Sequence, residues 1–250
     1  MRIDLADPGL RFVVRGGAAG SEGGGKGSAL STKVSSFVRD NGLLAGINAL
    51  PFDVSSAQEG EKRTNVGIVI SEGRLISPSN PRYYAIVWYA DGEPAIVPQA
   101  ELSSTENIVN AVGGFHQILK DNELTERALN SKPRYPRSAV GLSTVGLSTG
   151  GLLTGGNPAD KKFLYLLVID GDRPGSIGAT EAETALLLKA LGAVDGINLD
   201  GGGSSALALH YSDGVVRVVN TPVHGGIPGR ERAVAGCLGV GISNITGDDK

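Results

Sequence analysis

The stretch Phe163-Leu-Tyr-Leu-Leu-Val-Ile-Asp170, taken with Gly196-Ile-Asn-Leu-Asp-Gly-Gly-Gly-Ser-Ser205, decides the expected fold. The first stretch is a continuous apolar run, which is typical of a strand buried on both faces. Between the two, Thr180 and Glu183 have the spacing of a capping box, and Gly192 would close the helix that follows. Strand, helix and strand within residues 163–211 predict a parallel βαβ unit. We therefore expect an α/β (α+β) fold with a mixed β-sheet core flanked by helices.

Short strands and one further helix are expected on the N-terminal side of this unit and just after it. They are a strand over 1–15 broken at Asp7-Pro8-Gly9, a helix over 28–41, a strand over 43–48, hairpins centred on Glu72-Gly73 and Asp91-Gly92, and strands over 139–142 and 205–211. Glycine-rich loops are expected over 16–27 and 143–158. A chain of 250 residues with this pattern is expected to form a single domain, residues 1–250.

Composition narrows the functional classes. Glycine supplies 38 of the 250 residues, which indicates many tight turns or close backbone approaches. The net charge is −3 with no basic stripe, so nucleic acid is not an expected partner. The single cysteine, Cys237, excludes an internal disulfide, and its apolar surroundings favour a buried strand residue. No membrane span and no signal peptide are recognisable, which leaves the compartment open, an exported or cell-envelope location included.

Two aspartates carry the catalytic hypothesis. Asp170 and Asp200 each follow a predicted parallel strand, and ligands bind beyond the carboxyl ends of such strands. If the strands are neighbours, the two carboxylates share a cleft and their pKa values move apart, as an acid/base pair requires. The glycines at 201–203 would let a ligand approach the backbone, and Ser204 and Ser205 offer hydroxyls. The alternatives are a plain glycine-rich turn after Leu199 and a turn-forming Asp-Gly at 170–171.

Arginines, one glutamate and the histidines are weaker candidates. Arg137 and Arg173 could bind a phosphodiester anion or be ordinary surface residues, and Glu231 with Arg232 could line the site or form a surface pair. His116, His210 and His224 lack metal-ligand spacing and are expected to be structural. The segment 20–27, with Lys26, nearly matches a nucleotide phosphate loop, but Gly27 stands where Ser or Thr should hold magnesium.

The motifs together resemble the phosphodiester glycosidase family, that of the mannose 6-phosphate uncovering enzyme. The stretches that carry the resemblance are Ile3-Asp-Leu-Ala-Asp-Pro-Gly9, Pro136-Arg-Ser-Ala-Val-Gly141, Val168-Ile-Asp-Gly171 with Arg173-Pro-Gly175, Thr180 with Glu183, Ile197-Asn-Leu-Asp-Gly-Gly-Gly-Ser-Ser205, Val219-Asn220 and Glu231-Arg232. The resemblance thus extends over nearly the whole chain.

The chain departs from the family at several positions. Asn48-Ala-Leu-Pro-Phe52 stands where the family usually has Asn-Gly-Gly-Phe-Phe, and Gly236 lies where an Asn is usual. Ser138 and Ala206 occupy positions where Thr is common. These departures leave the aspartates in place but put the substrate identity in question.

The resemblance implies hydrolysis of a sugar-1-phosphodiester, such as one of α-N-acetylglucosamine, with release of free sugar and a phosphate monoester. The implied catalytic residues are Asp200, Asp170 and Glu231. The implied phosphate ligands are Arg137 and the amides of Gly201, Gly202 and Gly203, and the implied sugar-pocket residues are Asn48, Asn198, Asn220 and Glu231. Arg173, Ser204, Ser205 and Arg232 complete the substrate-binding candidates.

A carbohydrate phosphodiester is the expected partner, and the sequence sets no oligomeric state. No cofactor is expected, although a divalent metal joining Asp170 and Asp200 is not excluded. Two other functions stay open: a non-catalytic carbohydrate-binding protein on the same scaffold, because the Asn48 segment is altered, and a nucleotide-dependent enzyme that uses Lys26.

Overall fold

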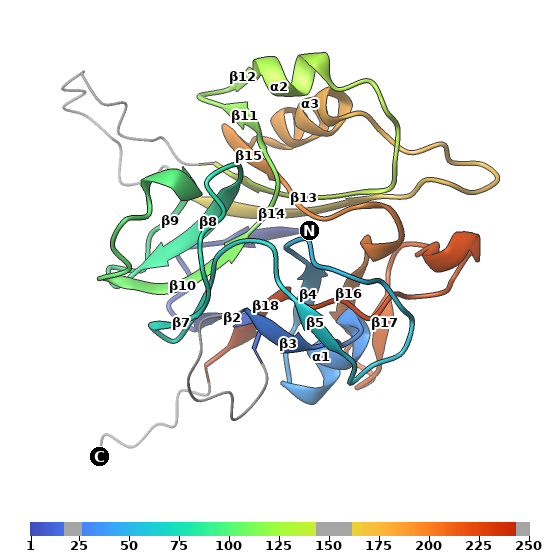
Figure 1. Ribbon diagram of the computed structural model, residues 1–250, viewed down its shortest axis with the longest axis horizontal. Helices are drawn as coiled ribbons and strands as arrows, with labels where there is room; N and C mark the ends of the chain where they lie inside the picture. The colour runs from blue at the N-terminus through green and yellow to red at the C-terminus, as the bar shows by residue number, and fades with distance from the viewer. Residues whose placement is uncertain (18–26, 144–161, 244–250) are drawn as a thin grey trace.

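The computed structural model describes residues 1–17, 27–143 and 162–243 and has layers of antiparallel sheet covered by short helices (Figure 1). The upper sheet in Figure 1 has six strands in the order β1 (Arg2–Asp4), β14 (Phe163–Ile169), β13 (Arg137–Leu142), β15 (Asp195–Asn198), β11 (Gln117–Lys120) and β12 (Glu123–Leu124). Its outer face is covered by α2 (Glu126–Asn130) and α3 (Glu181–Leu191). Ala139, Tyr165 and Leu188 pack in this helix-to-sheet layer.

The lower sheet has five strands and is covered from below by α1 (Val34–Asp40). Its order is β17 (Val216–Val218), β16 (Leu207–His210), β4 (Ala45–Asn48), β18 (Cys237–Ile242) and β2 (Leu10–Arg15). Phe37 of α1 packs with the buried thiol of Cys237, so the sequence-based placement of this cysteine in a buried strand is confirmed.

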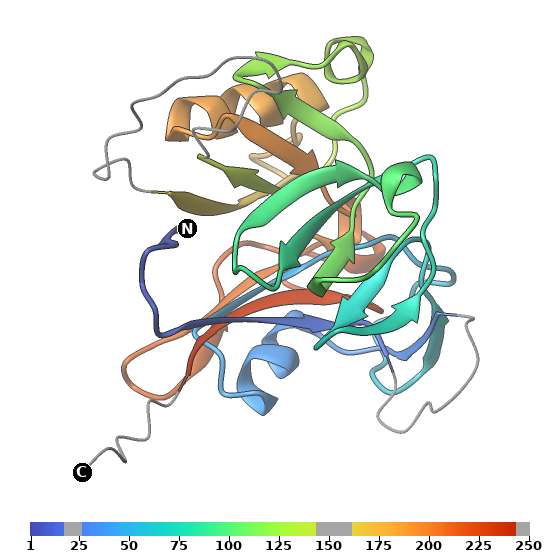
Figure 2. The same ribbon diagram turned by 90° about the vertical axis from the view of Figure 1, so that its left-hand side faces the viewer.

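A third, side sheet lies in front of the other two in Figure 2. Its order is β7 (Arg74–Ser77), β6 (Val69–Ser71), β10 (Ile108–Gly113), β8 (Tyr84–Tyr89) and β9 (Pro94–Pro98). A two-stranded sheet, β3 (Ser28–Leu30) with β5 (Lys62–Thr64), and the 3₁₀ turns η1 (Gln99–Glu101), η2 (Gly202–Ser204) and η3 (His224–Gly226) complete the described elements. One core joins all three main sheets, with Val140, Ile47 and Trp88 as one contributor from each.

The predicted parallel βαβ unit is wrong, because every ladder between named strands is antiparallel. β14, α3 and β15 do follow one another, but β13 lies between the two strands and pairs with both. The α/β class with a mixed sheet is therefore replaced by layers of antiparallel sheet. A local pattern cannot show this insertion, since β13 comes from an earlier part of the chain.

One part of the prediction holds although β13 lies between the two strands. β14 and β15 are each antiparallel to β13, so they run in the same direction and their carboxyl ends reach the same edge of the sheet. Two strand spacings of about 4.8 Å separate them instead of one. Asp170 and Asp200 thus follow strands that end on one side of the molecule, at the right of Figure 1.

Several predictions of local structure are confirmed, and one is partly wrong. The capping box at Thr180 and Glu183, the left-handed Gly192 and both hairpins, β6–β7 and β8–β9, are confirmed. The helix predicted over 28–41 is partly wrong, because its first residues form β3. Most of both glycine-rich loops lies outside the described residues. Among the described helices, none has the length and apolar character that crossing a bilayer would require.

Candidate active site

Asp200 and the three glycines lie in the loop after β15. Hydrogen bonds join this loop to the lower sheet. The Asp200 amide donates to the carbonyl of Ala49 (2.8 Å), and the Asn48 side-chain amide donates to the Asp200 carbonyl (2.6 Å). Asn48 Oδ1 accepts from the Ser138 hydroxyl and from the Ala206 amide. Asn48 is fully buried, and its hydrogen bonds hold three segments together.

The glycines of this loop allow close contacts within the protein. A Cβ on Gly201 would lie 2.8 Å from the Pro136 carbonyl oxygen, and one on Gly203 would lie 2.6 Å from Arg232 Nη2. The Gly202 amide donates to the same Pro136 carbonyl. The Gly201 amide bonds to the Asp200 carboxylate. Two of the three amides predicted to bind phosphate are therefore already used inside the molecule.

Asp200 has the most perturbed carboxylate of the site. Desolvation raises its pKa to about 6, against hydrogen bonds from the Ser204 hydroxyl and the Gly201 amide and the nearby charge of Arg232. Arg232 in turn donates to Ser204 Oγ (3.0 Å) and to His224 Nδ1 (3.1 Å). A carboxyl group with this pKa can both take up and release a proton near neutral pH.

The pKa of Asp170 is shifted in the opposite direction. Burial acts to raise its pKa, but Arg173 (2.6 Å), the Thr221 amide (2.8 Å) and Asn220 outweigh burial, so the pKa of Asp170 lies below its ordinary value. The two pKa values are therefore displaced in opposite directions. The causes are separate partners and desolvation, not the mutual repulsion that adjacent strands would have produced.

Asn220 connects the two aspartates. Its Nδ2 donates to the Ser205 carbonyl (2.9 Å), its Oδ1 accepts from the Leu207 amide (3.1 Å), and it bonds to Asp170. Ser205 is adjacent to Ser204, the partner of Asp200. We call this set the carboxylate network; its members are Asp170, Arg173, Asp200, Ser204, Asn220 and Arg232.

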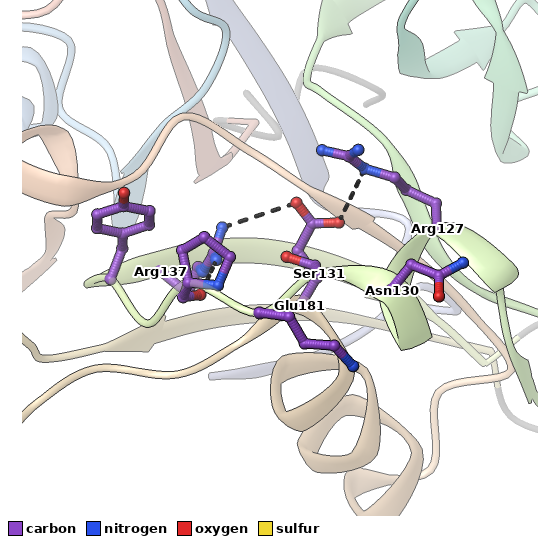
Figure 3. A pocket seen from close by; sticks show the side chains of 8 residues that line it. Arg127, Asn130, Ser131, Arg137 and Glu181 are labelled. Atoms are coloured by element: carbon purple, nitrogen blue, oxygen red, sulfur yellow. Dashed lines mark hydrogen bonds and ion pairs between the residues drawn. The ribbon is translucent and has the colours of Figure 1, made fainter.

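A pocket of about 490 Å³ is lined in part by Gly201 and Gly202 of the glycine loop. We call it the triglycine pocket; its lining residues are Tyr83, Phe115, His116, Arg127, Tyr135, Arg137, Glu181, Asn198, Gly201 and Gly202. A neighbouring pocket of about 400 Å³ shares four of these residues and adds Asn130, Ser131, Lys132 and Pro133. Figure 3 shows the Glu181 carboxylate between the guanidinium groups of Arg127 and Arg137.

The alternation of side chains along β13 explains why Arg137 lines the pocket. Val140 and Leu142 of β13 point into the central core, whereas Ala139 packs on the helix side, so Arg137 also lies on the helix side. There Arg137 Nε donates to the Ala179 carbonyl (2.9 Å) and Nη2 to that of Pro133 (3.0 Å). Arg137 is 7% exposed, and its remaining nitrogen, Nη1, lies 3.9 Å from Glu181 Oε1.

Three residues that line the pocket have buried polar atoms without a hydrogen-bond partner in the described part of the chain. They are Glu181 Oε2, Asn198 Oδ1 and His116 Nδ1. Glu181 is 5% exposed and Asn198 2% exposed. Burial raises the pKa of Glu181 against the opposing charges of Arg127 and Arg137.

Glu231 is not brought to the carboxylate network. Its two oxygens accept from the amide (3.0 Å) and the hydroxyl (2.7 Å) of Ser35, in the first turn of α1. The first turn of a helix has unpaired amides and a partial positive charge, which suits a carboxylate. Glu231 therefore caps a helix that has no side-chain cap from Lys33.

Sequence reasoning missed several pocket residues. Glu181 was not singled out in the sequence, and His116 was expected to be structural. The sequence signal for Glu181 is its place at the first position of α3, directly after the Thr180 cap. No comparable signal marks Tyr83 or Arg127, which come from segments distant in sequence. Across the described ranges, no group of three or more His, Cys, Asp or Glu side chains is placed to hold a metal ion.

The comparisons place the chain among known proteins. The zebrafish N-acetylglucosamine-1-phosphodiester α-N-acetylglucosaminidase catalytic domain, auto-inhibited by its pro-peptide, has a similar fold at 20% identity, with a TM-score of 0.63, over 93% of this chain and 73% of that one. A hypothetical protein from Synechocystis matches at 15% identity and a TM-score of 0.56, over 96% of this chain and 58% of that one. A Burkholderia pseudomallei protein matches at 16% identity and a TM-score of 0.55, over 96% and 72%.

No curated protein matches the chain in sequence. The sequence pattern of the phosphodiester glycosidase family matches residues 41–241, which include every member of the carboxylate network and the whole triglycine pocket. The match covers most of the 250 residues. On this ground the chain belongs to the phosphodiester glycosidase family.

Proposed function

We propose that the protein hydrolyses a sugar-1-phosphodiester, with α-N-acetylglucosamine 1-phosphate as the first sugar phosphate to test. Water attacks C1, the bond between C1 and the bridging oxygen breaks, and that oxygen leaves with the phosphate as a monoester. Family membership supports this class of reaction. The observation that carries the proposal is the carboxylate network, in which Asp200 and Asp170 have oppositely displaced pKa values.

The two aspartates have different roles in this proposal. Asp200, with a pKa of about 6, is largely ionised at pH 7 and takes the proton of the attacking water. Asp170 stays ionised and contributes a fixed negative charge that stabilises the oxocarbenium-like transition state. Arg232, whose Nη1 already donates to Ser204 Oγ at 3.0 Å, binds the phosphate oxygens.

Turnover in water enriched in ¹⁸O tests the proposal directly. The probe is the methyl phosphodiester of α-N-acetylglucosamine 1-phosphate, and the products are followed by phosphorus NMR and mass spectrometry. We expect methyl phosphate without the label and N-acetylglucosamine with the label at C1. Label in the phosphate would show cleavage of the P–O bond and would exclude the glycosidase mechanism. Absent turnover with retained sugar binding would favour the carbohydrate-binding alternative.

A further inference from the structure

We propose that the triglycine pocket is a sugar-ring subsite, in which Glu181 and Asn198 accept hydrogen bonds from ring hydroxyls or an acetamido N–H. The inference rests on the proposed function for the identity of the ring, since the pocket itself indicates only a ligand rich in hydrogen-bond donors. A ring in this pocket would lie beside Gly201 and Gly202, the two residues that follow Asp200 in the chain.

The unpaired buried atoms are the first argument. A buried polar atom without a hydrogen bond costs free energy, so native proteins leave few of them. Here three such atoms, on Glu181, Asn198 and His116, belong to residues that line one pocket. Glu181 Oε2 and Asn198 Oδ1 are acceptors, which matches a ligand rich in hydroxyl donors.

The charges around Glu181 strengthen this argument. Its carboxylate is 3.6 Å from Arg127 Nε and 3.9 Å from Arg137 Nη1, which is too far for hydrogen bonds although close enough for ion pairs. The ion pairs hold the carboxylate in place, as Figure 3 shows, and leave its hydrogen-bonding capacity for a ligand.

The aromatic side chains are the second argument. Tyr83 meets Phe115 edge to face with ring centroids 5.1 Å apart, and meets His116 at 5.9 Å. All three rings line the pocket. Such rings provide an apolar wall against which the C–H face of a pyranose can pack, while its hydroxyls reach the acceptors.

The glycine loop lies next to both the proposed subsite and the carboxylate network. Gly201 and Gly202 line the pocket, while Gly203 touches the Arg232 guanidinium. A sugar ring held by Glu181 can therefore direct C1 and its phosphate across backbone that carries no side chains. The scissile bond would then lie at the boundary between the pocket and the carboxylate network.

Titration of the protein with free N-acetylglucosamine, followed by NMR, tests the subsite without requiring turnover. The chain has three histidines, so the His116 ring resonances can be assigned by His116→Phe. We expect these resonances to shift with the sugar, and Glu181→Gln to weaken binding about tenfold or more, because a hydrogen bond to a charged group is lost. Glu123→Gln, at a side chain 84% exposed, is the matched control and should bind as the wild type.

Several outcomes would overturn the subsite. Unchanged sugar affinity in a folded Glu181→Gln variant would do so, and so would a His116 shift with inorganic phosphate but not with the sugar. His116→Phe retains the aromatic wall and should weaken binding less than Glu181→Gln. If sugar binding depends on Glu181 but no phosphodiester is cleaved, the proposed function fails and the subsite stands. If turnover occurs and Glu181→Gln leaves KM unchanged, the reverse holds.

Discussion

The carboxylate network and the triglycine pocket differ in whether their acidic side chains have hydrogen-bond partners within the protein. In the carboxylate network, Asp170 accepts from Arg173, Thr221 and Asn220, and Asp200 is bonded to Ser204 and Gly201. In the triglycine pocket, buried atoms of Glu181, Asn198 and His116 have no hydrogen-bond partner among the described residues. In the network the oxygens of both aspartates are bonded within the protein, as in a preorganised reaction centre, and the unpaired buried atom is a donor, Arg173 Nε. In the pocket the unpaired atoms include two acceptors, Glu181 Oε2 and Asn198 Oδ1, which a ligand can satisfy.

The largest effect that this difference predicts is at Asp200. Asp200→Asn removes the proton acceptor and should lower kcat/KM about 10²–10⁴-fold. Its folded pKa of about 6 lies above that of an unfolded aspartate, so the wild type loses stability as the pH rises from about 4 to 6. The variant should lack that loss, of up to about 3 kcal/mol, in urea unfolding at pH 4 and 7. Full activity in the folded variant would remove Asp200 from the reaction.

Asn48→Ala should cause the next largest effect, on stability. The substitution leaves Ser138, the Ala206 amide and the Asp200 carbonyl without their buried partner. Unpaired buried groups cost about 1–3 kcal/mol each, and relaxation will reduce the sum, so we expect a loss of about 2–4 kcal/mol in urea unfolding. Asn130→Ala, at an exposed position, should stay within about 0.5 kcal/mol of wild type. A loss no larger than that control would mean Asn48 does not clamp the loop.

The pH dependence of kcat/KM tests whether Asp200 acts in its ionised form. Because Asp200 acts ionised, kcat/KM should rise with pH through about 6 and then level off. Arg232→Gln removes a charge that lowers the Asp200 pKa, so the midpoint of this rise should move to higher pH. Arg230→Gln, at an exposed neighbour, should leave the midpoint in place. A profile that falls through pH 6 would assign Asp200 as an acid instead.

The smallest effect is expected at Glu231. Glu231→Gln weakens the cap on α1 and should cost about 1 kcal/mol of stability, measured by thermal unfolding, with kcat nearly unchanged. A drop in kcat of a hundredfold or more would restore the catalytic role expected from the sequence.

The sequence predicted what local patterns encode. The Thr180–Glu183 cap, the hairpins and the strand before Asp170 are determined by neighbouring residues, and they were recognisable for that reason. The place of β13 between β14 and β15 depends on long-range pairing, which no local period reveals.

The same division holds within the site. Asp200 and its glycines form one contiguous motif, so they stood out in the sequence. Glu181, His116 and Tyr83 converge from three distant segments, and only the fold brings them to one pocket. The contact of Glu231 with Ser35, 196 residues away, was likewise not recognisable from the sequence.

Steady-state kinetics of Asp200→Asn, Glu181→Gln and the double variant, on the methyl phosphodiester, test the division between the carboxylate network and the triglycine pocket most directly. We predict that Asp200→Asn lowers kcat with little change in KM, that Glu181→Gln raises KM about tenfold or more, and that the double variant shows both changes. If Glu181→Gln lowered kcat as much as Asp200→Asn with KM unchanged, the pocket would belong to the reaction centre, contradicting the account.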